Sequence, residues 1–214
     1  MTRPLRAAAP ETTRPIRFGV HGSSRLAERI VTAIGYGREE IEFVPYDVME
    51  PFRPLRDGRM DLMIVKYGLL EPDIVSSRPV AFDGRAVLVS ASHPLARRDT
   101  VSVEDVAAYD AFTCPGDFPP YVWDKVVPPT TPGGLPIRRV HPMTTLQAMA
   151  AILTRTDAVH LSFQSLDMVV PPEIRVVPVH DLPAAPVSLA WLRDRRPSPG
   201  VAAFIFDAER GMEL

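Results

Sequence analysis

Residues 16–34 read IRFGVHGSSRLAERIVTAI, and their pattern indicates the fold of the chain. Its first five residues are apolar enough for a short buried strand, and residues 21–24 (HGSS) form a turn of small and polar side chains. Apolar residues then recur at the spacing of one helix face, at Leu26, Ile30, Val31 and Ile34. The stretch therefore predicts a strand, a turn and a helix, which together are the repeating unit of an α/β protein.

The same alternation continues along the chain. Further strands are predicted over residues 41–46, 62–67, 75–90, 111–114, 137–140, 158–162, 174–179 and 187–192. Further helices are predicted over residues 51–57, 103–108, 121–126 and 145–153, and from residue 199 onward. Strands that alternate with helices predict mostly parallel sheets, and two such series in 214 residues favour two small lobes over one large sheet.

Capping signals mark three of these helices. Ser102 with Asp105 forms an imperfect capping box, and Thr144 with Gln147 forms a complete one. Ser198 is the expected N-cap of the last helix, with proline in its first turn. The helix starts at Ser23–Ser24 and Thr144–Thr145 are expected to present unpaired backbone N–H groups.

Composition excludes several classes of protein. Hydrophobic residues make up 46% and charged residues 23% of the chain, so it is not a disordered protein. No membrane span or secretory signal is visible, which predicts a cytoplasmic protein without membrane contact. One cysteine excludes an intramolecular disulfide and a cysteine-based zinc site. A net charge of −2 gives no electrostatic reason to bind nucleic acid directly.

Four segments in order carry a resemblance to a known family. They are IRFGV at 16–20, LRDGRMDL at 55–62, VLVSASHPLA at 87–96 and VSVEDV at 101–106. Their order and spacing resemble the effector-binding domain of LysR-type transcriptional regulators, over about residues 16–210. The resemblance implies a two-lobed, periplasmic-binding-protein-like (type 2) α/β fold, whose lobes are joined by two crossing strands.

The resemblance also implies domain limits and partners. Residues 1–15 would be a tail, residues 16–90 and 187–214 lobe one, and residues 91–186 lobe two. Such domains bind small, often anionic or aromatic effectors in the cleft and often form dimers, so a homodimer is expected. The chain departs from the family after the helix at 145–153, where TRTD replaces a glycine turn. Fifteen residues cannot hold the family's winged helix-turn-helix, so the chain is either a stand-alone domain, which is the favoured expectation, or a fragment of a full regulator.

Residues that follow the strands are the candidates for ligand contact, because ligands of open α/β sheets lie beyond the carboxyl ends of the strands. The candidate set is Ser23, Ser24, Lys66, Tyr67, Cys114, Phe118, Thr144, Thr145 and Ser162. The two serines and the two threonines begin helices, where backbone N–H groups attract anions, although plain helix capping also explains them. Lys66, one of two lysines, adds a positive charge, unless it only extends to solvent at the sheet edge. These features predict an anionic or strongly polar ligand.

An enzyme of the same fold is the alternative to a sensing or regulatory domain. His21, Lys66 and His141 follow strands in different parts of the chain, and lobe closure would bring them together for acid–base chemistry of the lyase, dehydratase or cyclase type. Cys114 is favoured as an inert buried thiol, and His160 as a core or edge residue of its strand. No phosphate loop, dinucleotide fingerprint or metal-ligand spacing is present, so neither cofactor nor metal is expected.

Overall fold

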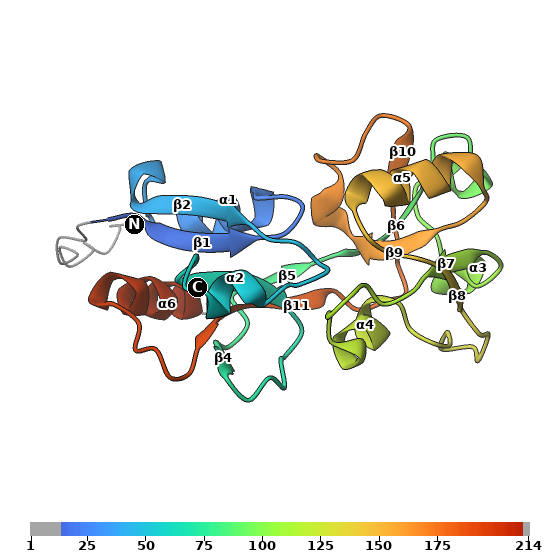
Figure 1. Ribbon diagram of the computed structural model, residues 1–214. Coiled ribbons are helices and arrows are strands. Elements are labelled where there is room, and N and C mark those ends of the chain that lie inside the picture. Colours follow the sequence, from blue (N-terminus) through green and yellow to red (C-terminus); the bar gives the residue numbers. More distant parts are fainter. Residues whose placement is uncertain (1–13, 212–214) are drawn as a thin grey trace.

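The computed structural model describes residues 14–211, so residues 1–13 of the predicted tail lie outside the described residues. The described chain forms two lobes that lie side by side in Figure 1. Lobe one is built on the sheet that contains strand β1 (Ile16–Val20), and lobe two on the sheet that contains strand β6 (Arg85–Ser90). The predicted two-lobed α/β class is confirmed.

Lobe one is a mixed sheet in the strand order β2-β1-β3-β11-β4, with β5 also paired to β11. Its remaining strands are β2 (Ile41–Pro45), β3 (Leu62–Lys66), β4 (Ile74–Ser76), β5 (Ala81–Asp83) and β11 (Ala185–Leu192). Its helices are α1 (Arg25–Ala33), η1 (Arg38–Glu40), α2 (Arg53–Arg56) and α6 (Pro199–Gly211). Only the β1–β2 and β1–β3 pairs are parallel, because β11 runs opposite to all three of its neighbours.

The core of lobe one buries the apolar face of α1 against the sheet. Phe18 of β1 is fully buried, and its ring centre lies 5.6 Å from that of Phe204 of α6. The predicted helical stripe is confirmed, since Leu26, Ile30 and Val31 are buried in this core and Ile34 packs against it half-buried. The stripe is thus used within the chain and does not leave a surface for a second copy.

Lobe two contains an antiparallel sheet in the order β10-β6-β9 and a separate parallel pair, β7–β8. Its remaining strands are β7 (Asp110–Phe112), β8 (Arg138–His141), β9 (His160–Phe163) and β10 (Ile174–Pro178). Its helices are η2 (Pro94–Arg97), α3 (Val103–Val106), α4 (Pro120–Val126), α5 (Leu146–Arg155) and η3 (Gln164–Leu166). The prediction of mostly parallel sheets is therefore wrong for both lobes, because three of the five strand pairs described in lobe one are antiparallel as well.

The chain crosses between the lobes twice. The first crossing passes from β5 to β6 through Gly84, and the second from β10 to β11 (Figure 1). Because β6 pairs only with strands of lobe two, the first crossing falls before residue 85 and not after residue 90 as predicted. The returning strand β11 enters the sheet of lobe one from the far lobe, and this reverses its direction relative to β3.

Two of the three predicted helix caps are observed at the predicted residue, and the third lies one residue further along the chain. Ser102 begins α3 and Ser198 precedes α6, and each accepts a backbone N–H with its hydroxyl oxygen. The capping box predicted for Thr144 is wrong by one residue. Helix α5 begins at Leu146, so Thr145 is the N-cap and accepts from the backbone N–H of Ala148 at 3.1 Å.

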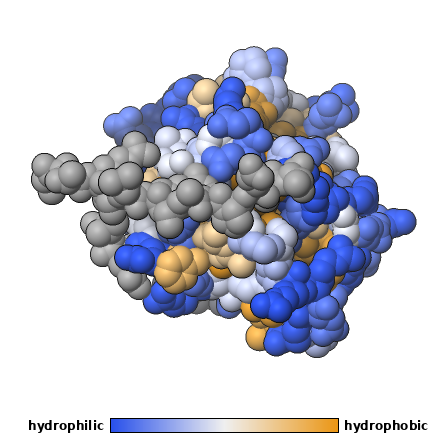
Figure 2. Space-filling model, turned by 90° about the vertical axis from the view of Figure 1, so that its left-hand side faces the viewer, coloured by the Kyte–Doolittle hydropathy of each residue, from blue (hydrophilic) through white to orange (hydrophobic). Residues whose placement is uncertain are grey.

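Among residues 14–211, no helix is long and apolar enough to cross a membrane. Figure 2 shows the end of the molecule formed by lobe one, where hydrophilic side chains dominate and hydrophobic ones form separate spots. This face therefore offers no broad apolar patch outside the area covered by grey atoms.

Candidate functional site

A cavity of about 500 Å³ lies between the two lobes. Lobe one lines it with the turn after β1, the segment 45–52 and strand β3, and lobe two with helix α4, residues 143–149 and strand β9. This volume is typical of pockets for small organic ligands. A ligand in the cavity would contact both lobes.

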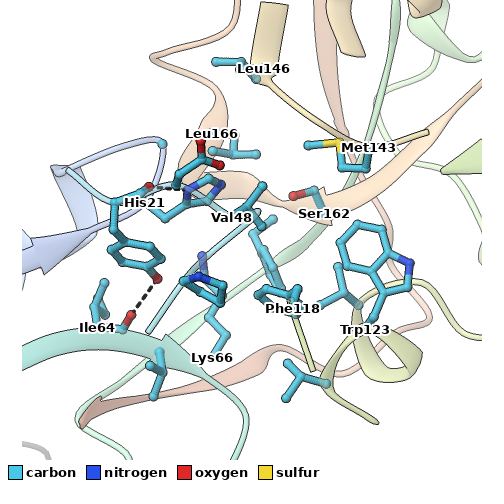
Figure 3. A pocket seen from close by; sticks show the side chains of 18 of the residues that line it. His21, Val48, Ile64, Lys66, Phe118, Trp123, Met143, Leu146, Ser162 and Leu166 are labelled. Carbon is cyan, nitrogen blue, oxygen red and sulfur yellow. Dashed lines mark hydrogen bonds between the residues drawn. The ribbon is translucent and has the colours of Figure 1, made fainter. Parts of the chain in front are cut away.

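The walls of the cavity are mainly apolar, as Figure 3 shows. Aromatic rings contribute from both lobes: Tyr46, Phe52, Phe118, Trp123 and Phe163. Methionines fill the spaces between them: Met63, Met143 and Met149. Flat aromatic walls and flexible thioethers favour a ligand with a large apolar body.

His21 brings an imidazole from the turn after β1, and its ring points into the cavity (Figure 3). Its Nδ1 lies 3.1 Å from the backbone carbonyl oxygen of Tyr46, which fits a tautomer that donates there and leaves Nε2 as an acceptor. The residue keeps exposed surface because the cavity is partly open. Desolvation still lowers the pKa of His21, against the opposing effect of the carbonyl, and favours the neutral ring.

Lys66, at the end of β3, lines the cavity but is already paired. Its Nζ lies 3.1 Å from the carboxylate of Asp83 and 4.1 Å from the ring centre of Phe163. Asp83 is buried and also accepts the backbone N–H of Ser165 at 3.2 Å. Desolvation lowers the pKa of Lys66, whereas Asp83 raises it. The ammonium is therefore held by groups of the chain itself.

His160 and Ser162 lie two residues apart on β9, and both line the cavity. Burial lowers the pKa of His160 to about 3, so its ring is neutral at neutral pH. The centre of the His160 ring lies 6.0 Å from that of Trp123 and 5.3 Å from that of Phe112. Within the described chain the ring forms no hydrogen bond, and its Nδ1 is buried without a partner. Figure 3 shows the hydroxyl of Ser162 directed into the cavity.

The sequence analysis predicted His160 as a core or edge residue of its strand and did not place it at a ligand cavity. His160 is buried as expected, but it also lines the cavity. The sequence held a signal for this, because residues two apart in a strand share a face and Ser162 was already a candidate. Phe118, Thr144 and Thr145 also line the cavity, and the hydroxyl of Thr145 is engaged as a helix cap.

The structure does not bring Ser23 and Ser24 to the cavity. Ser23 accepts the backbone N–H of Arg25 at 3.2 Å, and Ser24 donates to Glu28 at 2.8 Å. The two preceding residues, His21 and Gly22, occupy the cavity wall instead. The turn was located correctly, but its serine side chains serve the start of helix α1.

Three other predicted residues also lie outside the lining. The thiol of Cys114 donates to the carbonyl oxygen of Phe118 at 3.2 Å, and burial raises its pKa, which fits the inert thiol favoured by the sequence. The ring of His141 packs on that of Phe112, with 5.7 Å between the ring centres. The predicted acid–base group of His21, Lys66 and His141 is therefore not assembled. Tyr67 lies at the contact between the lobes.

Arg85, which the sequence analysis did not single out, joins Tyr67 to lobe two. Its buried guanidinium donates to the hydroxyl of Tyr67 at 2.8 Å and to the backbone carbonyls of Ser162, Lys125 and Val126. Two of these carbonyls end helix α4, where a cation is favoured by the helix dipole. Tyr67 itself has a positive φ of 64°, so the chain turns sharply after β3 to reach this contact.

The lobes also touch beside the cavity, at Met49 and Gly116. The backbone N–H of Asp117 donates to the carbonyl oxygen of Met49 at 2.8 Å. Gly116 has a φ of +37°, and a Cβ there would lie 2.4 Å from the same oxygen. Only glycine permits this close approach without displacing one lobe. The arrangement is thus one in which the lobes are closed.

Within residues 14–211, no group of three or more His, Cys, Asp or Glu residues could hold a metal ion. The cavity offers hydrogen-bonding groups and apolar walls for an organic ligand.

Comparisons with known proteins give the family and the fold. The family model of the LysR substrate binding domain matches residues 35–207. No curated protein matches the sequence. The solved effector binding domain of QuiR in complex with shikimate is similar at a TM-score of 0.66 and 19% identity, over 93% of this chain and 97% of that one.

Two further solved structures show the same likeness. The effector binding domain of a BenM variant gives a TM-score of 0.63 at 18% identity, over 94% of this chain and 95% of that one. CbnR, a LysR family transcriptional regulator, gives 0.69 at 15% identity, over 92% of this chain and 69% of that one. At these identities, the likeness of structure establishes the fold.

Proposed function

This chain belongs to the family of LysR substrate binding domains, and we propose from that premise that it binds a small-molecule effector in the cavity between its lobes. The observation that carries the proposal is the cavity of about 500 Å³, which both lobes line. A ligand that contacts both lobes binds the closed arrangement better than an open one, so it shifts the population toward closure.

The named relatives support a regulatory role for such closure. The QuiR domain is described in complex with shikimate, and CbnR in complex with its target DNA. We propose that ligand-dependent closure of this chain regulates transcription in the cytoplasm. The chain has 24 basic and 26 acidic residues, so we assign it no direct contact with DNA.

We also propose that the protein forms a homodimer. The family resemblance is what supports this oligomeric state. The apolar stripe of α1 is buried in the core of lobe one, so it does not support a dimer interface. Sedimentation equilibrium measures the state directly. We expect twice the 23.6 kDa mass of one chain, and a single-chain mass at tens of micromolar would contradict the dimer.

Blocking the cavity tests the proposed function. Ser162→Phe places a ring where the hydroxyl now points into the cavity, whereas Ser92→Phe adds the same ring at an exposed position of lobe two. Equilibrium dialysis against shikimate and against naphthol measures binding of a polar and an apolar probe. We expect the wild type and Ser92→Phe to bind at least one probe, and Ser162→Phe to bind neither. Equal binding by Ser162→Phe would refute the proposal.

A further inference from the structure

The charges around the cavity balance within the chain. Lys66 is paired with Asp83 at 3.1 Å, and Arg85 lies behind the cavity wall with four oxygen acceptors. Asp47 lines the cavity from an exposed position. Among the described residues, the lining therefore carries one ammonium and one carboxylate side chain, and its two imidazoles are neutral at neutral pH.

Lys66 is poorly placed to recruit a ligand carboxylate. Its ammonium contacts a buried carboxylate on one side and the ring of Phe163, 4.1 Å away, on another. An anionic ligand would have to share this ammonium with Asp83 and would lose its own hydration among apolar walls. Burying a charge without a dedicated partner is strongly unfavourable.

The groups without partners call for a neutral hydrogen-bonding ligand. The ring of His160 forms no hydrogen bond with the described residues, and the hydroxyl of Ser162 points into the cavity from the same strand. A neutral imidazole offers one donor and one acceptor, and a serine hydroxyl offers both. A ligand hydroxyl matches this pair, because it too donates and accepts. The rings of Phe118 and Trp123 supply flat apolar surface nearby.

We propose that the cavity takes an electrically neutral, mainly apolar ring compound with one hydroxyl-type hydrogen-bonding group, and that it discriminates against organic anions. This inference rests on the proposed function and names the class of ligand for that site. It replaces the anionic ligand expected from the sequence, whose two serines lie outside the cavity and whose lysine is already paired.

Three probes with one ring system test the ligand class: naphthol, naphthoate and naphthalene, the first two substituted at the same ring position. We expect the wild type to bind naphthol at least about 10-fold more tightly than naphthoate, because the anion is desolvated without a free counter-charge. Naphthol should also bind about 3- to 10-fold more tightly than naphthalene, as one net hydrogen bond would give. His160→Phe should remove the advantage of naphthol over naphthalene while naphthalene still binds.

Removing the carboxylate that pairs with Lys66 should weaken or abolish the preference for naphthol over naphthoate. Asp83→Asn keeps an oxygen for the N–H of Ser165 but removes the charge that now occupies Lys66. We expect naphthoate to bind this variant at least about 10-fold more tightly than it binds the wild type, as a charge-assisted hydrogen bond would give. The affinity of this variant for naphthol should stay within about 3-fold of the wild-type affinity.

The outcomes separate the two proposals. If naphthoate binds the wild-type cavity as tightly as naphthol, or if Asp83→Asn gives it no advantage, the ligand class is wrong while the cavity remains the site. If Ser162→Phe leaves all binding intact, the proposed function fails, and the ligand class fails with it.

Discussion

Gly116→Ala should weaken ligand binding by preventing full closure of the lobes. The added Cβ would lie 2.4 Å from the carbonyl oxygen of Met49, and the nearest atoms are backbone, which cannot move aside by a side-chain rotation. Relief of this contact requires the two lobes to separate locally. The closed arrangement is therefore penalised, whereas an open one is not.

The expected loss of affinity can be estimated from the interactions that break when the lobes separate at this contact. The hydrogen bond from Asp117 to Met49 contributes about 1 kcal/mol. Opening the contact by roughly 1 Å forfeits dispersion contacts beside it that contribute a similar amount. A total of about 2 kcal/mol reduces the affinity of a closure-dependent ligand by about 30-fold.

Gly134→Ala is the matched control. Gly134 also has a positive φ, +86°, but no atom lies within 4 Å of a Cβ added there. Both variants carry the backbone strain of a left-handed alanine, about 1–2 kcal/mol, and Gly116→Ala also loses the contact with Met49, so its midpoint of thermal unfolding should fall further than that of Gly134→Ala. Calorimetric titration with naphthol should show the loss of affinity in Gly116→Ala alone. Wild-type affinity in that variant would refute the idea that binding requires closure at Met49.

Three further predictions concern stability. Arg17 and other contacts lower the pKa of Asp61 to about 2, so this carboxylate stabilises the fold above the pKa of the unfolded chain. About 1 kcal/mol of that stability should be lost on acidification to near pH 3, and Asp61→Asn should not show this loss in urea unfolding. Arg85→Met leaves several carbonyls without their donor and should lower the free energy of unfolding by about 2–4 kcal/mol in the same assay. Thr145→Ala should cost about 1 kcal/mol and Thr144→Ala much less, and the reverse order would contradict the observed cap.

Local patterns allowed much of the fold to be predicted. The strand, turn and helix over residues 16–34 and the cap at Ser102 depend on neighbours in sequence, and the structure contains all of them. The direction in which β11 pairs does not depend on its own residues but on the crossing from lobe two. The same local pattern fits either direction, which is why parallel sheets were expected.

The site was predicted less well, because contacts between distant residues decide it. Lys66, Phe118 and Thr144 follow or adjoin strands and were found by that rule. The rule does not say which side chains of a turn face the cavity, so Ser24 was chosen where His21 and Gly22 lie. The pairing of Lys66 with Asp83, 17 positions along the chain, could not be predicted from the sequence, and it is the reason why we now propose a neutral ligand in place of an anionic one.

A crystal structure of the protein with bromonaphthol would show whether the cavity between the lobes binds a neutral ring compound, because anomalous scattering from bromine locates the ligand. We expect one strong bromine peak between the lobes, beside Phe118 and Trp123, with the ligand hydroxyl within hydrogen-bonding distance of His160 or Ser162. A peak only outside this cavity, for instance in the polar groove beside Arg25 and Arg29, would contradict it.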